Sequence, residues 1–377
     1  MLALFMKYDI VIVGAGISGA TLAERFANTL QKKVLIIEKR DHIGGNCFDY
    51  YNTDGILVSK YGAHLFHTSY KDIWEYVQRF SQWIPYKHKV LAKVDGKLVP
   101  VPVNITTVNL LFNLSLKTEK EMIEWLSKNR INIKDPKNSK EAALASVGEA
   151  LYKKIFENYT KKQWEKDPEE LDAEVLNRIP VRTTFEEGYF SDTYQAQPKD
   201  GYTKLFENML TNKNITIKLN TDYFAIKDSL QFDMLFYTGP IDQFFSYNTG
   251  EKLEYRSLKF VEETLDMEYF QENSVINYPN EEKFTRIVEY KHITGQKHPK
   301  TTIVKEYPSS VGEPYYPIPS KRNKEIYEKY KKEALALEKQ QIYFVGRLAN
   351  YKYFNMDQAF KNALDLFAYL MENKHIK

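Results

Sequence analysis

Continuous apolar runs mark the strands of a buried parallel sheet. The first two runs lie at 8–13 and 33–37, and a helix-like segment separates them. Three later runs, at 214–219, 233–238 and 341–345, predict strands that return to the same sheet. This order of strands and helices is typical of an open α/β sheet that binds a nucleotide at the carboxyl ends of its strands.

A second pattern predicts antiparallel structure. Residues 89–94 and 97–103 flank Asp95-Gly96, a pair that tolerates the positive φ angles of a tight type I′ hairpin turn. Pro100 and Pro102 cannot donate to a ladder, so the second strand is expected at a sheet edge. Short alternating runs between 253 and 305 predict further antiparallel strands, which would form a platform that presents Asn277 and Arg286.

The third pattern is helical and extends from about 106 to 164. Thr118 and Glu121 have the spacing of a capping box at a helix start. Apolar residues at three- and four-residue steps are predicted to pack as core, namely Leu110, Leu111, Leu114, Met122, Ile123, Leu126, Ala143, Leu144, Val147, Leu151 and Ile155. The segment 164–178 is polar and contains Asp167-Pro168, so we expect a mobile lid there.

These patterns predict an α/β fold in three parts. A Rossmann-like, nucleotide-binding domain is expected from residues 1–85, 200–245 and 335–377. A helical bundle at 104–175 would be inserted on the substrate side. An antiparallel sheet subdomain would comprise residues 86–103, 176–199 and 246–334.

Composition narrows the function classes. The 53 Lys and Arg against 50 Asp and Glu give a net charge of +3, which is too balanced for general attraction to nucleic acid or membranes, so an anion must be held by locally placed cations. Cys47 is the only cysteine, so no intrachain disulfide is expected and a reducing cytoplasm is predicted. The apolar prefix 1–6 lacks the basic region and cleavage site of a signal peptide, and no apolar run is long enough to span a membrane. His64 and His67 lie three residues apart without a further ligand at metal spacing, so no metal site is predicted.

The glycine motif after the first strand carries the first chemical prediction. Gly14 permits the tight turn, Gly16 admits a pyrophosphate to the backbone, and Gly19 lets helix and strand pack closely. Glu38 ends the second strand, where an acidic side chain can hold ribose hydroxyls. A second glycine pair, Gly44-Gly45, follows soon after. This arrangement resembles the FAD-binding opening of flavoproteins of the amine-oxidase and mutase type, which favours FAD over NAD.

Further motifs extend the resemblance over nearly the whole chain. Tyr159-Thr160, Lys162-Gln163-Trp164 and the Arg-x-Pro-Val-Arg sequence at 178–182 resemble prokaryotic UDP-galactopyranose mutases. Other stretches that resemble this family are 64–68, 194–203, 255–258, 285–287, 313–317 and 346–348.

The resemblance implies a flavin-dependent mutase that interconverts a UDP-hexopyranose, by default UDP-galactopyranose, with its furanose form. It implies attack of N5 of reduced FAD on the anomeric carbon without net redox change, a role in cell-surface polysaccharide synthesis, an external reductant such as NAD(P)H, and a homodimer. The residues expected at the cofactor are Gly14, Gly16, Ser18, Gly19, Glu38, Lys39, Gly45, Asn46, His64, Arg347, Met356 and Asp357.

Two arginines are the expected catalytic centre. Arg178 and Arg286 match the family's diphosphate clamp, since a guanidinium offers a planar donor fork suited to phosphate. His64 is expected on the flavin side. The other substrate residues implied by the resemblance are Phe156, Tyr159, Trp164, Tyr189, Arg256, Asn277, Tyr316 and Tyr353. Taken alone, each of these would more often serve in packing or surface ion pairs.

Four places depart from the family pattern: Ile155, Ala63, Ala196-Gln197 and Asn355. They leave the sugar and nucleotide open, so UDP-N-acetylgalactosamine, a deoxyhexose or UDP-arabinopyranose remain alternatives. A flavin amine oxidase-like oxidoreductase is a second hypothesis, which would need neither Arg178 nor Arg286. A non-catalytic nucleotide-sugar-binding protein is the third.

Overall fold

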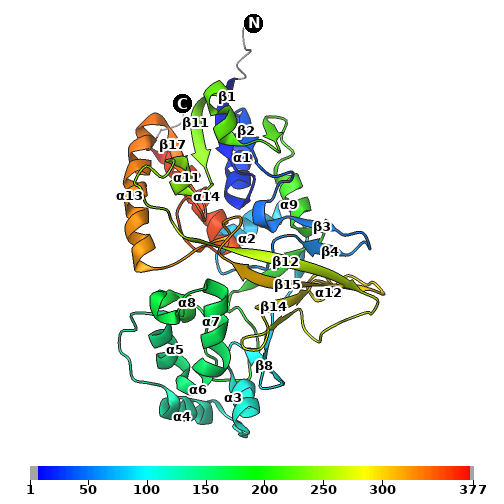
Figure 1. Cartoon of the computed structure of the whole chain (residues 1–377). Coiled ribbons are helices and arrows are strands. Elements are labelled where there is room, and N and C mark those ends of the chain that lie inside the picture. Colours follow the sequence, from blue (N-terminus) through cyan, green and yellow to red (C-terminus); the bar gives the residue numbers. More distant parts are fainter. Residues whose placement is uncertain (1–6, 374–377) are drawn as a thin grey trace.

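The computed structural model describes residues 7–373, so the apolar prefix 1–6 lies outside the described residues. A five-stranded parallel sheet forms one end of the molecule (Figure 1), with strand order β10-β2-β1-β11-β17. All its neighbouring strands pair in parallel, as the apolar runs predict. The strands are β1 (Lys7–Val13), β2 (Val34–Ile37), β10 (Ile215–Lys218), β11 (Gln231–Tyr237) and β17 (Ile342–Phe344).

Helices cover both faces of this sheet, which is why its strands are apolar on both sides. On one face, α1 and α14 meet through Phe26 and Phe367, whose ring centroids lie 5.2 Å apart. On the other face, Tyr223 and Phe244 pack against the sheet from two short helices. The helices of this part are α1 (Ile17–Leu30), α2 (Lys71–Gln78), α9 (Gly201–Met209), α10 (Tyr223–Ile226), α11 (Ile241–Phe244), α13 (Lys321–Leu337) and α14 (Met356–Glu372).

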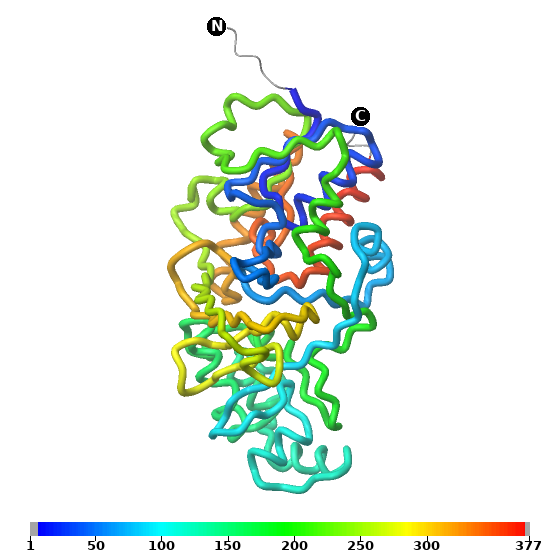
Figure 2. The backbone as a smooth tube through the Cα atoms, turned by 90° about the vertical axis from the view of Figure 1, so that its right-hand side faces the viewer, coloured from blue at the N-terminus to red at the C-terminus, as the bar shows by residue number. Residues whose placement is uncertain are grey.

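A helical insertion forms the opposite end of the elongated molecule (Figures 1 and 2). Thr118 closes the predicted capping box with Glu121 at the start of α4. The insertion contains α3 (Ile105–Phe112), α4 (Glu119–Asn129), α5 (Ser139–Val147), α6 (Glu149–Leu151), a π-helical turn (Tyr152–Phe156), α7 (Glu157–Trp164), a 3₁₀ turn (Pro168–Glu170) and α8 (Glu174–Asn177).

The core prediction for these helices is wrong at three positions. Leu110, Leu114 and Ile123 are 38%, 37% and 48% exposed. The short helices α3 and α4 each bury one face, and Met122 with Leu126 already fills the inward face of α4. Ile123 is therefore rotated away from the core by one residue step of the helix.

A seven-stranded sheet crosses between the two ends (Figure 1), in the order β16-β12-β15-β14-β13-β7-β8. It is antiparallel apart from the β13–β7 pair. Asp95 and Gly96 both have positive φ, at 51° and 75°, and β8 lies at the edge, as predicted from the hairpin and its prolines. The strands are β7 (Val90–Val94), β8 (Lys97–Val101), β12 (Tyr255–Leu265), β13 (Val275–Asn277), β14 (Arg286–Glu289), β15 (Thr301–Ser309) and β16 (Tyr316–Pro317).

Two small sheets join these parts. One has the order β5-β9-β6 and brings residues 66–68 and 83–85 alongside residues 194–198. The other is a two-stranded pair. Their strands are β3 (Asp49–Tyr51), β4 (Leu57–Ser59), β5 (Phe66–Thr68), β6 (Trp83–Pro85) and β9 (Tyr194–Pro198).

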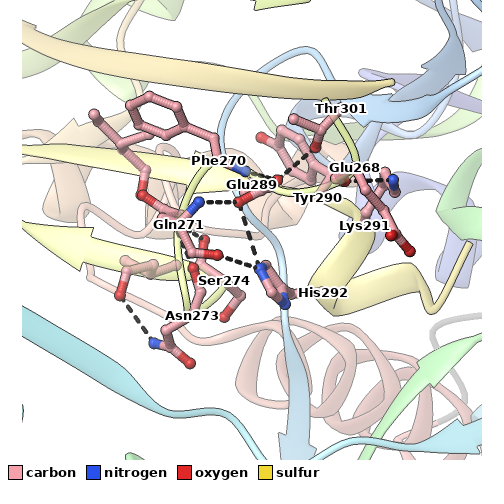
Figure 3. A network of polar contacts seen from close by, with 12 residues as sticks. Glu268, Phe270, Gln271, Asn273, Ser274, Glu289, Tyr290, Lys291, His292 and Thr301 are labelled. Atoms are coloured by element: carbon pink, nitrogen blue, oxygen red, sulfur yellow. Dashed lines mark hydrogen bonds and ion pairs between the residues drawn. The ribbon is translucent and has the colours of Figure 1, made fainter. Parts of the chain in front are cut away.

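A buried polar network fixes one end of β14, where α12 (Lys291–Thr294) begins (Figure 3). The Glu289 carboxylate is fully buried and accepts hydrogen bonds from the N–H groups of Phe270 and Gln271, each at 2.9 Å. The Thr301 hydroxyl also donates to it, and the His292 Nε2 atom lies 3.4 Å away. A buried carboxylate satisfied in this way makes a rigid corner. The other end of the same short strand carries Arg286.

Candidate active site

The first cavity of interest lies at the carboxyl edge of the parallel sheet and has a volume of about 340 Å³. Its lining begins in the glycine loop and the end of β2, and continues through loops 221–224 and 313–315 to the start of α14. The predicted cofactor residues that line it are Gly14, Gly16, Ser18, Glu38, Lys39, Gly45, Asn46, His64, Arg347 and Met356.

The backbone of this cavity is shaped for a phosphate. Gly14 has φ of +103°, and a Cβ atom there would lie 2.1 Å from the Thr238 Oγ1 atom. A Cβ atom on Gly45 would lie 2.8 Å from the Gly16 Cα atom, so the two glycine loops touch through their backbones. Helix α1 begins after Gly16 with no side-chain cap, unlike α3 and α4. Its first N–H groups are therefore available to an anionic ligand.

Charged side chains close this cavity near the end of β2. The buried Glu38 carboxylate accepts hydrogen bonds from the N–H groups of Ala15, at 2.8 Å, and Arg40, at 2.9 Å. The Arg40 guanidinium pairs with Glu313 on the opposite rim, and the Lys39 amine lies 3.6 Å from the same carboxylate. This Arg40–Glu313 pair joins the two edges of the cavity.

The second cavity lies between the parallel-sheet end, the seven-stranded sheet and the helical insertion, and has a volume of about 490 Å³. It meets the first cavity at four shared lining residues, His64, Arg347, Asn355 and Met356. The predicted substrate residues that line it are Phe156, Tyr159, Trp164, Arg178, Tyr189, Asn277, Arg286, Tyr316 and Tyr353. A ligand in one cavity can therefore reach a ligand in the other.

Arginines and tyrosines interleave in this second cavity. The Arg178 guanidinium lies over the Tyr353 ring, 4.4 Å from its centroid, and the Tyr353 and Tyr316 rings stack at 5.6 Å. Arg286 Nη2 donates to the Tyr159 hydroxyl at 2.8 Å. Although burial alone would raise the pKa of Tyr353, the nearby Arg178 and Arg347 charges lower it. Arg178 and Arg347 thus make the electrostatic potential at the Tyr353 hydroxyl positive.

Comparison with known proteins identifies the family. The family model for UDP-galactopyranose mutase matches residues 154–353, and a model for an NAD(P)-binding Rossmann-like domain matches residues 12–80. The chain is 37% identical to the dTDP-fucopyranose mutase of Escherichia coli over 97% of this chain and 99% of that protein. It is 33% identical to the UDP-galactopyranose mutase of Mycoplasma genitalium, covering 94% and 92%. The chain belongs to the UDP-galactopyranose mutase family.

A solved structure bears out the predicted fold class. The chain resembles a crystal structure of a reduced UDP-galactopyranose mutase with a TM-score of 0.77 and 17% identity, over 97% of this chain and 96% of that one. The mutase family consists of isomerases, and the fold is the α/β arrangement with an antiparallel sheet that the sequence predicts.

Three residues predicted in the site do not line either cavity. Gly19 lies behind the glycine loop, where a Cβ atom would come within 2.0 Å of the Gly14 carbonyl oxygen. Asp357 is buried in the first turn of α14 and accepts from the Gln358 N–H. Arg256 is 1% exposed and contacts α7 instead of the cavity. Gly19 and Asp357 each adjoin a residue that lines the first cavity, Ser18 and Met356 respectively.

Several polar residues that line the second cavity were missed in the sequence. They are His67, His88, Gln163, Asp192 and Glu306. Glu306 is 3% exposed, and its carboxylate lies 3.3 Å from Arg286 Nε. It follows Val304 at the two-residue step of a strand, and a lone acid on an apolar face is a signal that could have revealed it. His88 likewise precedes Val90 and Ala92 at two-residue steps, and all three line the second cavity. A lone histidine in line with an apolar strand face is the corresponding signal for this residue.

Burial keeps His64 and His88 of the second cavity neutral. It lowers the pKa of His64 to about 4 and that of His88 to about 3. The Arg347 charge acts in the same direction on His64, and the Arg286 charge does so on His88. Neither imidazole carries a positive charge at neutral pH, so the arginines supply the positive charge of the cavity.

Two further properties hold for residues 7–373. No helix in that range has the length and apolar character needed to cross a membrane. Among the same residues, no three His, Cys, Asp or Glu side chains come together in a metal-binding arrangement.

Proposed function

We propose that the chain is an FAD-dependent mutase that interconverts the pyranose and furanose forms of a nucleotide-linked hexose, with UDP-galactose as the first candidate. The observation that supports this most is the junction of the two cavities. A glycine-lined dinucleotide cavity opens, at His64, Arg347, Asn355 and Met356, into a cavity that carries three arginines. An intramolecular transfer on a nucleotide sugar needs both ligands to meet in this way.

The first cavity fits FAD by its backbone. The uncapped start of α1 offers N–H groups to the pyrophosphate, Glu38 lies where ribose hydroxyls would bind, and Gly45 permits close approach. Residues of loop 346–348 and the start of α14 would hold the isoalloxazine ring. When bound and reduced, FAD supplies the electron-rich nitrogen that this family's chemistry requires at the anomeric carbon.

The second cavity supplies the remaining steps. Arg178 and Arg286 would bind the diphosphate and stabilise the charge that develops on it as the sugar–phosphate bond breaks. Tyr316 and Tyr353 would offer hydroxyl groups to the same phosphates. Trp164, which is 4% exposed, would cover the sugar and exclude water. The pair Asn277 and Tyr159 would contact the base.

A dTDP-linked deoxyhexose is a second candidate, because one part of the cavity is lined by aliphatic side chains. These are Val90, Ala92, Val101, Ile155 and Ile179. Ala92 lies beside Asn277 in the β7–β13 ladder, so this surface adjoins the proposed base site. Burying the 5-methyl group of thymine there would favour thymine over uracil about fourfold, given about 0.8 kcal/mol per buried methylene.

The decisive experiment is an assay of the reduced protein with a panel of nucleotide sugars. It would include UDP-galactopyranose, UDP-N-acetylgalactosamine, UDP-arabinopyranose and a dTDP-deoxyhexose, with the furanose products separated by chromatography. Interconversion that requires dithionite and is about a hundredfold or more slower in Arg286→Ala supports the proposal. Consumption of an amine and O₂, with no furanose formed from any sugar, would instead indicate an oxidase.

Four associated properties complete the proposal. The family resemblance supports a cytoplasmic homodimer in a pathway to cell-surface polysaccharide, with NAD(P)H as the reductant. Light scattering on the purified holoenzyme tests the dimer. Anaerobic mixing with NADH or NADPH, followed by flavin absorbance, tests the reductant, and an unchanged spectrum with both would exclude direct reduction by either.

A further inference from the structure

Arg256 is the largest fully buried side chain of the described residues, yet it lines neither cavity. It lies near the start of β12, and its guanidinium reaches the end of α7. Its Nε atom donates to the Gln163 carbonyl oxygen at 3.1 Å, and its Nη1 atom donates to the Glu165 carboxylate at 2.8 Å. These two partners flank Trp164 in the sequence.

Trp164 is the point at which α7 ends and the segment 164–178 begins. Its ring packs with Leu171, Val175 and Ile318, and Tyr316 and Tyr353 pack against this cluster. The following residue, Glu165, has a left-handed backbone with φ of 49°, and its N–H returns to the Lys161 carbonyl. Carbonyl groups at a helix end carry partial negative charge, so a cation is stabilised there.

We propose that Arg256 is a positioning residue that holds Trp164 in the wall of the second cavity. The Arg256 guanidinium donates hydrogen bonds on both sides of the tryptophan, to the Gln163 carbonyl oxygen before it and to the Glu165 carboxylate after it. A lysine could reach one of these acceptors but not both, because it lacks the planar fork of the guanidinium. The kinetic consequences of this inference rest on the proposed mutase function.

A second anchor lies further along the same segment. The Asp172 N–H donates to the Pro319 carbonyl oxygen at 3.0 Å, and the Asp172 carboxylate lies 2.7 Å from the Lys324 amine. The segment is therefore attached to the β12–α13 part of the molecule near both 164 and 172. Of these two anchors, Arg256 is the more deeply buried. Its loss should therefore destabilise the segment more than loss of the Asp172 contacts.

The expected kinetic signature separates positioning from direct catalysis. When Trp164 leaves the cavity for a fraction of the time, the apparent affinity for the nucleotide sugar falls by that fraction. Substrate and transition state lose the same binding energy, so KM rises while kcat changes little. A residue that acted on the reacting atoms would lower kcat.

The test uses the substitutions Glu165→Gln, Arg256→Gln and Arg256→Lys, with a matched control. Glu165→Gln removes the charge of the partner at an exposed position and leaves the buried arginine in place, whereas Arg256→Gln removes both contacts. Glu169→Gln is the control, because Glu169 lies on the same segment but pairs with Lys140 of α5. Amide hydrogen exchange over 162–166 is measured on each holoenzyme, together with KM and kcat.

We expect exchange in Glu165→Gln to be about fivefold faster, as fits the loss of roughly 1 kcal/mol from a charge-assisted hydrogen bond. KM should rise by a similar factor, and Arg256→Lys should lie between the wild type and Arg256→Gln. Glu169→Gln should match the wild type. Exchange and KM that stay unchanged in both Glu165→Gln and Arg256→Gln would overturn the inference, as would a loss of kcat at constant KM.

The exchange measurement needs no substrate, so it separates the two proposals. Faster exchange in Glu165→Gln but not in Glu169→Gln supports the anchor even for a wild-type enzyme that converts none of the sugars tested. That combination would contradict the proposed function alone. If Arg256→Gln does not fold, Glu165→Gln decides the question.

Discussion

The two cavities are built from different parts of the polypeptide. The dinucleotide cavity is shaped by backbone: glycines that touch one another, an uncapped helix start, and the carboxyl ends of parallel strands. The second cavity is built by side chains from the π-helical turn and α7, from β7, β13, β14, β15 and β16, and from the loop before α14. A backbone site tolerates changes of charge but no added volume, whereas a side-chain site depends on each charge and its partner.

The largest effect is expected from a methyl group in the glycine loop. A Cβ atom on Gly19 would lie 2.0 Å from the Gly14 carbonyl oxygen, which is backbone and cannot turn aside. Gly19→Ala should therefore destabilise the protein by roughly 3 kcal/mol or more through overpacking. Urea unfolding of the apoprotein measures this.

Gly16→Ala is the matched control for that change. Its Cβ atom would meet only the Gly45 Cα atom, at 3.7 Å, and the backbone there has an ordinary φ of −79°. The apoprotein should unfold like the wild type to within about 0.5 kcal/mol, while the cofactor binds much more weakly. If Gly16→Ala retains cofactor with wild-type affinity, the first cavity does not depend on close backbone approach.

The next largest effect is a loss of activity on removal of a positive charge from the second cavity. Arg286→Ala removes a guanidinium and leaves the buried Glu306 carboxylate without its cation. We expect kcat/KM to fall about 10²–10³-fold, the range typical of a lost oxyanion-stabilising group. Tyr159→Phe removes only the hydroxyl that Arg286 contacts and should cost about 1 kcal/mol or less. Equal losses in the two variants would show that the tyrosine, not the charge, is what matters.

The first cavity could be inferred from the residues themselves, whereas the second needed the family resemblance, because a backbone site is encoded locally. Gly14, Gly16 and Glu38 occur within a single βαβ unit whose geometry follows from their order. Arg286 was placed on its platform by strand alternation, and its role came from family resemblance. Glu306 and His88 were missed because each belongs to the site only through a sheet that pairs distant strands. Arg256, expected at the substrate, lies behind the cavity wall, since motif matching gives position along the chain but not side-chain direction.

Acid sensitivity should follow from the buried histidines of the second cavity. The pKa of His88 is lowered to about 3 in the folded protein, mainly by burial, whereas an unfolded histidine has a pKa near 6.5. Between these values the unfolded chain holds the extra proton, so stability is complete above pH 6.5 and is lost as the pH falls. His88 should account for about 3 kcal/mol of the stability lost between pH 7 and pH 4.

The His88→Gln variant isolates this contribution. Its urea midpoint should fall less between pH 7 and pH 4 than that of the wild type, whatever the substitution costs at pH 7. His64, with a pKa lowered to about 4, continues to act in the same direction in both proteins. Parallel losses in variant and wild type would show that His88 does not contribute.

The smallest effect is expected from the Arg40–Glu313 pair, the side-chain contact that joins the two edges of the first cavity. Glu313 joins Arg40 across its rim but is 38% exposed, and such pairs contribute about 1 kcal/mol or less. Glu313→Gln should therefore release cofactor about threefold faster at low salt. The difference should vanish near 0.5 M salt, where screening removes the pairing energy.

Recovery of flavin fluorescence after dilution measures the release rate. The control is Glu263→Gln, which breaks the distant surface pair with Lys305. A hundredfold faster release that persists in high salt would mean that the first cavity also depends on a side-chain pair, and the contrast between the two cavities would no longer hold.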